Sequence, residues 1–198
     1  MNDAELARWG ELVSTGTRSA MQNLGMMLGQ DIEVGSFGLR RVGVEEIAEL
    51  MGGPETTSVG IYLTVSGSAD GHMMLMYEPT TACSFVDMLM MLPPGTTDTL
   101  GEMERSALGE MGNITGAGFL NAISDNAGID LRPSPPMVLT DMAGALLDIV
   151  AADISLTQDE AFIAETEFTA PDRRITGMFF VIPSQALLSV MAGLEKVA

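Results

Sequence analysis

Ser106, Glu110 and Asn113 are polar residues in the apolar, glycine-rich segment Ser106–Gly118, which reads SALGEMGNITGAG. A helix turns about 100° per residue, so Glu110 falls roughly 40° and Asn113 roughly −20° from Ser106, on one narrow face. Near neutral pH the Asn amide is neither nucleophile nor general base, but its two donors and its acceptor can orient an attacking water. The Glu carboxylate can pair with a lysine or a metal-bound water of a partner. An outward Glu and Asn on an amphipathic helix are usually only solvated, so the spacing alone does not decide between these readings.

Glycines form a stripe next to this polar face, at Gly109, Gly112 and Gly116. Each interior glycine costs a helix about 0.5–1 kcal/mol relative to alanine. We therefore expect another backbone to approach the helix closely along the stripe, most simply that of a neighbouring helix. The core-facing side of the helix is predicted to carry Ala107, Leu108, Met111, Ile114 and Ala122.

The sequence indicates an internal duplication. Gly10-Glu11 matches Gly109-Glu110 at an offset of 99 residues, and Gly29–Ile32 matches Gly128–Leu131 at the same offset. We predict one domain, residues 1–198, made of two repeats of approximately 1–95 and 96–198. The segment PPGTT, residues 93–97, would join them.

Each repeat is predicted to run helix, strand, short helix, strand, strand, helix. In the first repeat these elements cover about 3–28, 32–39, 44–51, 58–67, 72–77 and 79–92. In the second, the long helix follows a capping box, Thr99-Leu-Gly-Glu102, and the later elements cover 133–142 (extended), 143–151, 160–170, 175–183 and 184–194. Consecutive hairpin-like strands favour antiparallel pairing. The predicted fold is therefore α+β and two-layered, with pseudo-two-fold α-β-α-β-β-α halves and a largely antiparallel sheet covered by helices.

Composition and charge exclude several classes of protein. The formal net charge is −18, from 27 acidic and 9 basic residues, so phosphate backbones and anionic membrane surfaces would be repelled. The N-terminus lacks the apolar stretch of a signal peptide, and the most apolar run, residues 73–92, is interrupted by Glu78, Pro79 and Asp87. We expect a cytoplasmic protein that binds no nucleic acid and does not insert into membranes.

Other candidate sites are weaker. Cys83 is the only cysteine and His72 the only histidine, which excludes an internal disulfide and supports neither a zinc site nor a Ser-His-Asp triad. We expect this chain to bind no metal or cofactor. The 17 methionines are predicted to fill the core mainly; a plastic binding surface is the alternative.

The segment around Asn113 resembles the CheC/CheX/FliY family of phosphatases, which act on the phosphorylated chemotaxis response regulator CheY. The family signature is Asp or Ser, three residues, Glu, two residues, Asn, then glycine and small residues; here it stands as Ser106, Glu110 and Asn113 followed by small residues. Length, duplication and the continuation through FLNAISDNAGIDLRPSPPMVLTDMAGALL are most similar to the CheC branch.

The resemblance implies roles for these residues. Asn113 would enter the receiver's active site and orient water against the aspartyl phosphate, and Glu110 would contact the receiver's lysine. Ser106, Gly112 and Gly116 would support them. The Mg²⁺ would belong to the receiver rather than to this chain.

The first repeat departs from the signature. Ala7 replaces the Ser, Glu11 is retained, and Ser14 stands where Asn113 would be, so this copy is predicted to be inactive. A second function class therefore stays open: a non-catalytic binding module, either a flagellar switch component or a scaffold for the receptor deamidase CheD.

Overall fold

In the described residues, the first half of the chain contains one long α-helix, two shorter helices and three strands. The structure is a computed structural model that describes residues 3–29, 33–154, 160–170, 173–176 and 178–183. Its first-half elements are α1 (Asp3–Leu28), β1 (Glu33–Gly43), the short 3-10 helix η1 (Val44–Met51), β2 (Thr57–Gly67), β3 (Gly71–Tyr77) and α2 (Pro79–Leu89). All of these were predicted, with bounds that differ by a few residues.

In the described residues, the second half also begins with a long helix and continues with strands, a shorter helix and further strands. It contains α3 (Glu102–Ala127), β4 (Leu131–Pro133), β5 (Met137–Met142), α4 (Ala143–Ile154), β6 (Glu160–Ala170), β7 (Arg173–Thr176) and β8 (Met178–Pro183). The extended segment predicted over 133–142 is thus two strands separated by a break. The helix predicted over 184–194 lies outside the described residues.

The strand pairs within the described residues are all antiparallel, in line with the largely antiparallel sheet that was predicted. One sheet has the order β4-β2-β3-β8, with β5 also pairing with β2, and the other has the order β1-β6-β7. Strand β6 also contacts β8, so the two sheets adjoin. Strand β2 pairs with β3 of the first half and with β4 and β5 of the second half.

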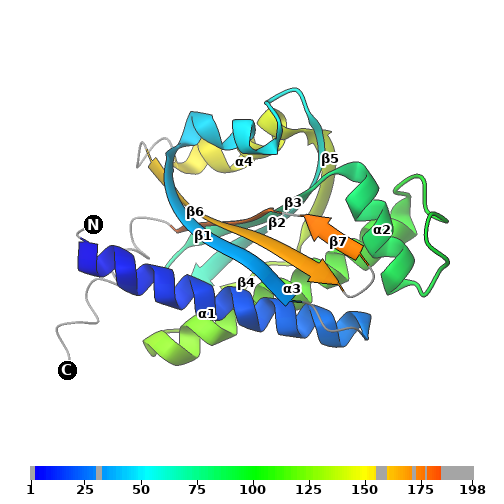
Figure 1. Ribbon diagram of the computed structural model, residues 1–198. Coiled ribbons are helices and arrows are strands. Elements are labelled where there is room, and N and C mark those ends of the chain that lie inside the picture. The colour runs from blue at the N-terminus through cyan, green and yellow to red at the C-terminus, as the bar shows by residue number, and fades with distance from the viewer. Residues whose placement is uncertain (1–2, 30–32, 155–159, 171–172, 177, 184–198) are drawn as a thin grey trace.

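The helices lie on both faces of the sheet (Figure 1). Ile61 and Leu63 of β2 point toward α1 and α3, and Tyr62, between them, belongs to a second cluster with α4. This alternation follows from the two-residue period of a strand. The predicted α+β class and antiparallel sheet are confirmed, and η1 with α4 adds a smaller helical layer to the two layers expected.

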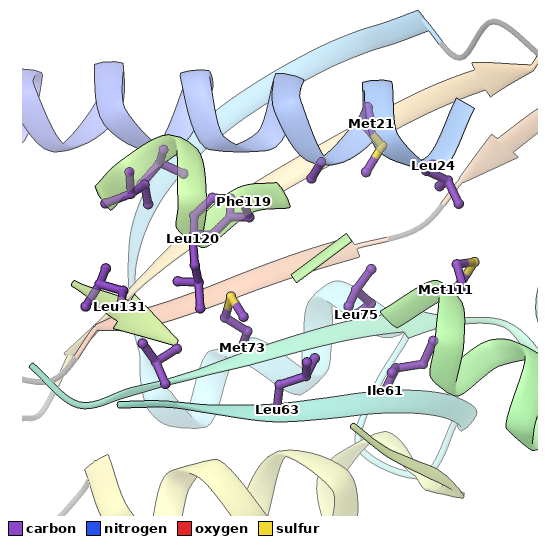
Figure 2. Close-up of a cluster of buried hydrophobic side chains, with 14 of the residues drawn as sticks. Met21, Leu24, Ile61, Leu63, Met73, Leu75, Met111, Phe119, Leu120 and Leu131 are labelled. Atoms are coloured by element: carbon purple, nitrogen blue, oxygen red, sulfur yellow. The ribbon is translucent and has the colours of Figure 1, made fainter. Parts of the chain in front are cut away.

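The main core lies between the sheet and the two long helices (Figure 2). Methionine contributes substantially: Met21, Met73 and Met111 are buried in this core, and Met74 and Met76 are buried in the second cluster with α4. This agrees with the core role predicted for this residue type. Met26, Met91 and Met103 are instead exposed. The other labelled core residues in Figure 2 are Leu24, Ile61, Leu63, Leu75, Phe119, Leu120 and Leu131.

Helices α1 and α3 correspond closely. Each has 26 residues, and both ends of α3 lie 99 positions after those of α1. Each helix is followed by a glycine in the left-handed region, Gly29 with φ 63° and Gly128 with φ 67°, a conformation that favours glycine. These matches support the predicted duplication.

The predicted capping box of α3 is wrong. Gly101 is the N-cap, in an extended conformation, and no side chain caps the helix. Glu102 is therefore the first residue of the helix rather than the third, and its side chain cannot reach back as the motif requires.

The segment predicted to join the repeats is held by Asp87 of α2. This buried carboxylate accepts hydrogen bonds from the backbone N–H groups of Gly95 (2.7 Å), Thr96 (3.2 Å) and Thr97 (2.9 Å). Burial raises the pKa of Asp87, but the hydrogen bonds from Thr97, Gly95 and Thr96 lower it more, so it lies below its ordinary value. The ionised side chain therefore fixes the segment between α2 and α3 against α2.

Candidate functional site

Helix α3 presents Ser106, Glu110 and Asn113 to solvent, as the helical period predicts. Leu108 and Met111 are fully buried on the opposite side. Ala107, Ile114 and Ala122, which were also predicted to face the core, are only partly buried.

Glu110 and Asn113 line one groove together with Gly109 of the same helix. The other wall of this groove is the segment Pro133–Pro136, between β4 and β5. We call this groove the proline groove and the segment Pro133–Pro136 the proline wall. The volume of the groove is about 380 Å³. Ser106 is exposed one turn earlier on α3 and is not among the lining residues.

The proline wall was not predicted from the sequence. A signal was present, because Pro133, Pro135 and Pro136 interrupt a segment otherwise suited to a strand. Which helix face this interruption would approach depends on how β4 and β5 align on β2, and the local pattern does not carry that information.

Ser134 attaches the wall to β2. Its backbone N–H donates to the carbonyl of Thr64 (2.9 Å), and its Oγ accepts from the N–H of Thr64 (3.0 Å). The Oγ also donates to the carbonyl of Pro135 (3.1 Å). The Ser134 side chain thus accepts a hydrogen bond from a backbone N–H of β2 at the break between β4 and β5.

The glycine stripe of α3 faces the sheet rather than a neighbouring helix, so that expectation was wrong. A β-carbon on Gly112 would overlap Cγ2 of Ile61, and one on Gly116 would lie 3.1 Å from Cδ2 of Leu63 and 3.2 Å from Cε of Met73. Both glycines are buried. They let α3 settle onto β2 and β3, and this placement brings Glu110 and Asn113 beside the proline wall.

The contact between the long helices uses different glycines. A β-carbon on Gly16 would lie 2.7 Å from Cδ2 of Phe119, and one on Gly118 would overlap the Asn23 amide and lie 3.5 Å from Cα of Ala20. The close helix–helix approach that we expected therefore exists, but on α3 it uses Gly118, two residues beyond Gly116, and not the predicted stripe.

The corresponding face of α1 is less open. Glu11 is exposed, whereas Ser14 is half-buried. Ala7 and Arg18 are exposed, and Thr15 Oγ donates to the carbonyl of Glu11 (2.9 Å). Position 14 thus differs from position 113 in exposure as well as in the missing amide.

The proline groove carries a single charged side chain, that of Glu110, among its lining residues. Within the described part of the chain, no three or more His, Cys, Asp and Glu side chains gather in a way that could hold a metal ion. Among the described residues that line the groove, none offers a positive charge to pair with Glu110.

The two residues considered as alternative sites are placed elsewhere. His72 is half-buried on β3, and its Nδ1 lies 2.8 Å from the hydroxyl of Tyr62. Cys83 lies on α2, where burial and the nearby Asp87, Asp98 and Glu104 carboxylates raise the pKa of its thiol. Neither residue lines the proline groove.

Known proteins resemble this chain both in the segment that carries Glu110 and Asn113 and in the fold as a whole. The model of the CheC-like family matches residues 103–139, a span that contains both α3 side chains and the whole proline wall. The CheY-P phosphatase CheC of Bacillus subtilis is 25% identical over 177 residues, which cover 87% of this chain and 85% of that protein.

Solved structures show the same fold. FliY of Thermotoga maritima superposes with a TM-score of 0.76 at 20% identity, covering 99% of this chain and 98% of that one. CheX of Borrelia burgdorferi, solved in complex with CheY, BeF3 and Mg²⁺, superposes with a TM-score of 0.57 at 22% identity, covering 87% and 97%. The predicted resemblance to the CheC/CheX/FliY family is confirmed. No helix in the described residues is long and apolar enough to cross a membrane.

Proposed function

We propose that this protein is a phosphatase that hydrolyses the aspartyl phosphate of a CheY-like response regulator. The observation that carries the proposal is that Glu110 and Asn113, both exposed on α3, line one groove within the segment that matches the CheC-like family. The similarity to a CheY-P phosphatase over most of the chain supports the same activity.

Asn113 orients the attacking water in this proposal. The side-chain amide both donates and accepts hydrogen bonds, so it can hold a water with an oxygen lone pair directed at the phosphorus. The water oxygen forms a bond to phosphorus, the bond from phosphorus to the receiver's aspartyl oxygen breaks, and the aspartate leaves as a carboxylate with its electron pair. The protons of the water pass to the phosphate and to solvent. Fixing the water in this geometry removes much of the entropic part of the barrier.

Glu110 binds the receiver by pairing with its active-site lysine. No lysine or arginine lines the proline groove, so the carboxylate is free to attract a cation of the partner. The Mg²⁺ belongs to the receiver and supplies neutralisation of the phosphoryl oxygens. In this proposal, this chain only positions the attacking water and the receiver, and the receiver provides the metal ion.

Buried glycines set the height of the site above the sheet. Gly112 and Gly116 contact β2 and β3 side chains, and they support the site by allowing α3 to lie close to the strand that carries the proline wall. Ser106 is exposed one turn before Glu110 and extends the surface that meets the receiver.

The test is phosphate release from a CheY-type receiver of the same organism, charged with acetyl phosphate, with and without this protein. We expect release to accelerate in proportion to the protein added. A receiver that binds, as measured by titration calorimetry, without faster release would contradict the enzyme. That result would support the alternative, a non-catalytic binding module such as a flagellar switch component or a scaffold for CheD.

A further inference from the structure

The two repeats differ at one position in the strand that follows each long helix. In β1, Val34 pairs with Phe168 and Ser36 with Glu167, so one extra residue is inserted and pairing resumes at once. In the second repeat, Pro133 pairs with Val65 and Met137 with Tyr62, again with one extra residue. Here, however, the segment 134–136 stays outside the ladder and separates β4 from β5.

Prolines explain why pairing is delayed in the second repeat. Pro135 and Pro136 have no N–H to donate to a ladder. Their φ angles are fixed by the ring, and each residue before a proline is restricted to extended conformations. Together with the Ser134–Thr64 hydrogen bonds, these restrictions make the groove wall rigid before anything binds.

The two adjacent prolines have different surroundings. Pro136 is half-buried and lies over α3, since a β-carbon on Gly112 would be 3.6 Å from Cβ of Pro136. Pro135 is exposed at the edge of the groove. Its ring therefore offers apolar surface to a partner across from Glu110 and Asn113, and it is not needed to fill the core.

We propose that Pro135 is a specificity-determining contact for the receiver, which rests an uncharged segment flanking its phosphorylated aspartate on this ring. This proposal rests on the proposed function. The occupant follows from the lining: apart from Glu110, the groove presents only glycine, proline, serine and the Asn113 amide. A wall that is already rigid loses little conformational entropy on binding, so the contact contributes most of its surface to affinity.

The same inference accounts for the asymmetry between the repeats. Strand β1 continues without a break through Gly43, and no proline stands at positions 34–37. The first repeat thus lacks both the Asn and the proline wall, and α3 is the favoured docking face.

The experiment compares Pro135→Ala and Pro135→Asp with matched variants at Pro94. Pro94 is also exposed and also belongs to a Pro-Pro pair, in the segment between α2 and α3. We expect Pro135→Asp to raise the KM for the phosphorylated receiver about tenfold, equivalent to about 1.4 kcal/mol, with kcat unchanged. Pro135→Ala should raise KM less, and both Pro94 variants should match the wild type.

Two further measurements separate a lost contact with the receiver from a loss of folding. Melting temperatures of the Pro135 and Pro94 variants should agree, because neither ring is buried. If a Pro135 variant does not fold, Gly109→Ala tests the opposite wall: its methyl group would lie 3.8 Å from Cγ2 of Val138, so it fits while narrowing the groove, and it should also raise KM. A KM equal to that of the matched controls, or a loss confined to kcat, would overturn the role of Pro135. A wild-type protein without activity would overturn the proposed function instead.

Discussion

Gly112 of α3 lies directly against Ile61 of β2, so closely that a β-carbon on Gly112 would overlap the Cγ2 methyl of Ile61. Ile61 is itself fully buried in the centre of the core, and its β-branched side chain has little freedom to move aside. This contact sets the distance between the helix that carries Glu110 and Asn113 and the strand that carries the proline wall.

We predict that Gly112→Ala destabilises the protein by about 1–3 kcal/mol, the usual cost of an overpacked core. Gly109→Ala is the matched control on the same helix. Its β-carbon would meet only ordinary contacts at 3.8 and 3.9 Å, and alanine stabilises a helix interior by about 0.5–1 kcal/mol. Denaturant unfolding measures both changes. A Gly112→Ala variant as stable as Gly109→Ala would contradict the packing described.

Asp87 should make stability depend on acid pH. Its pKa is lower in the folded protein than its ordinary value of 3.8, so the stability it contributes is present above that value and is lost as the pH falls through the lower, folded pKa. We expect the free energy of unfolding to fall below about pH 4 and to fall less steeply in Asp87→Asn.

The same variant should be less stable at neutral pH, by about 1–3 kcal/mol, because the amide presents a donor to N–H groups that need an acceptor. Asp98→Asn is the control, since Asp98 is exposed near the same segment. Chemical denaturation over a pH series measures the effect. Parallel pH curves for wild type and Asp87→Asn would show that Asp87 is not responsible.

Glu110→Gln tests the proposed anchor. The substitution keeps the shape and removes the charge, so we expect weaker binding of the receiver and a binding constant that depends less on salt. Asp125→Asn makes the same chemical change at another exposed position of α3 and should leave binding unaltered. The affinity for the receiver is measured by titration calorimetry at two salt concentrations. Equal affinities for wild type and Glu110→Gln would show that the carboxylate does not contact the receiver.

Ser14→Asn in an Asn113→Ala background tests the first repeat. We expect a small gain in receiver dephosphorylation, because Glu11 is exposed but position 14 is half-buried and no proline wall stands beside it. Adding Arg18→Gly should increase the gain further, because it removes a large exposed side chain from the α1 face on which the receiver would dock. Recovery to the wild-type rate would contradict the asymmetry inferred here, and no gain in folded variants would show that this face is not a latent site.

The helical period was enough to predict which α3 side chains reach solvent. Ser106, Glu110 and Asn113 depend only on their spacing, and spacing is a local property. The bounds of α1 and the antiparallel pairing of the strands could be predicted for the same reason. The helix follows from its hydrophobic period, and the hairpins follow from strand alternation and turn residues, all of which are short-range features.

The groove and the glycine contacts depend on residues far apart in the sequence. Ser134, which precedes the two prolines of the wall, is hydrogen-bonded to Thr64, 70 positions earlier, and Gly112 packs against Ile61 of β2. The glycine stripe predicted a close approach but not the element that makes it. That element is known only once the packing of α3 on the sheet is known.

Asn113→Ala gives the most direct test of the central claim. The side chain is exposed, so the variant should fold and bind the receiver. Loss of one preorganised group should slow dephosphorylation by about 10²–10³. Asn121→Ala, at another exposed position of α3, should retain the wild-type rate. The measurement is single-turnover phosphate release from a receiver charged with acetyl phosphate. With Asn113→Ala, we expect phosphate release to be nearly as slow as from the receiver without this protein. Release as fast as with Asn121→Ala would contradict the role of Asn113.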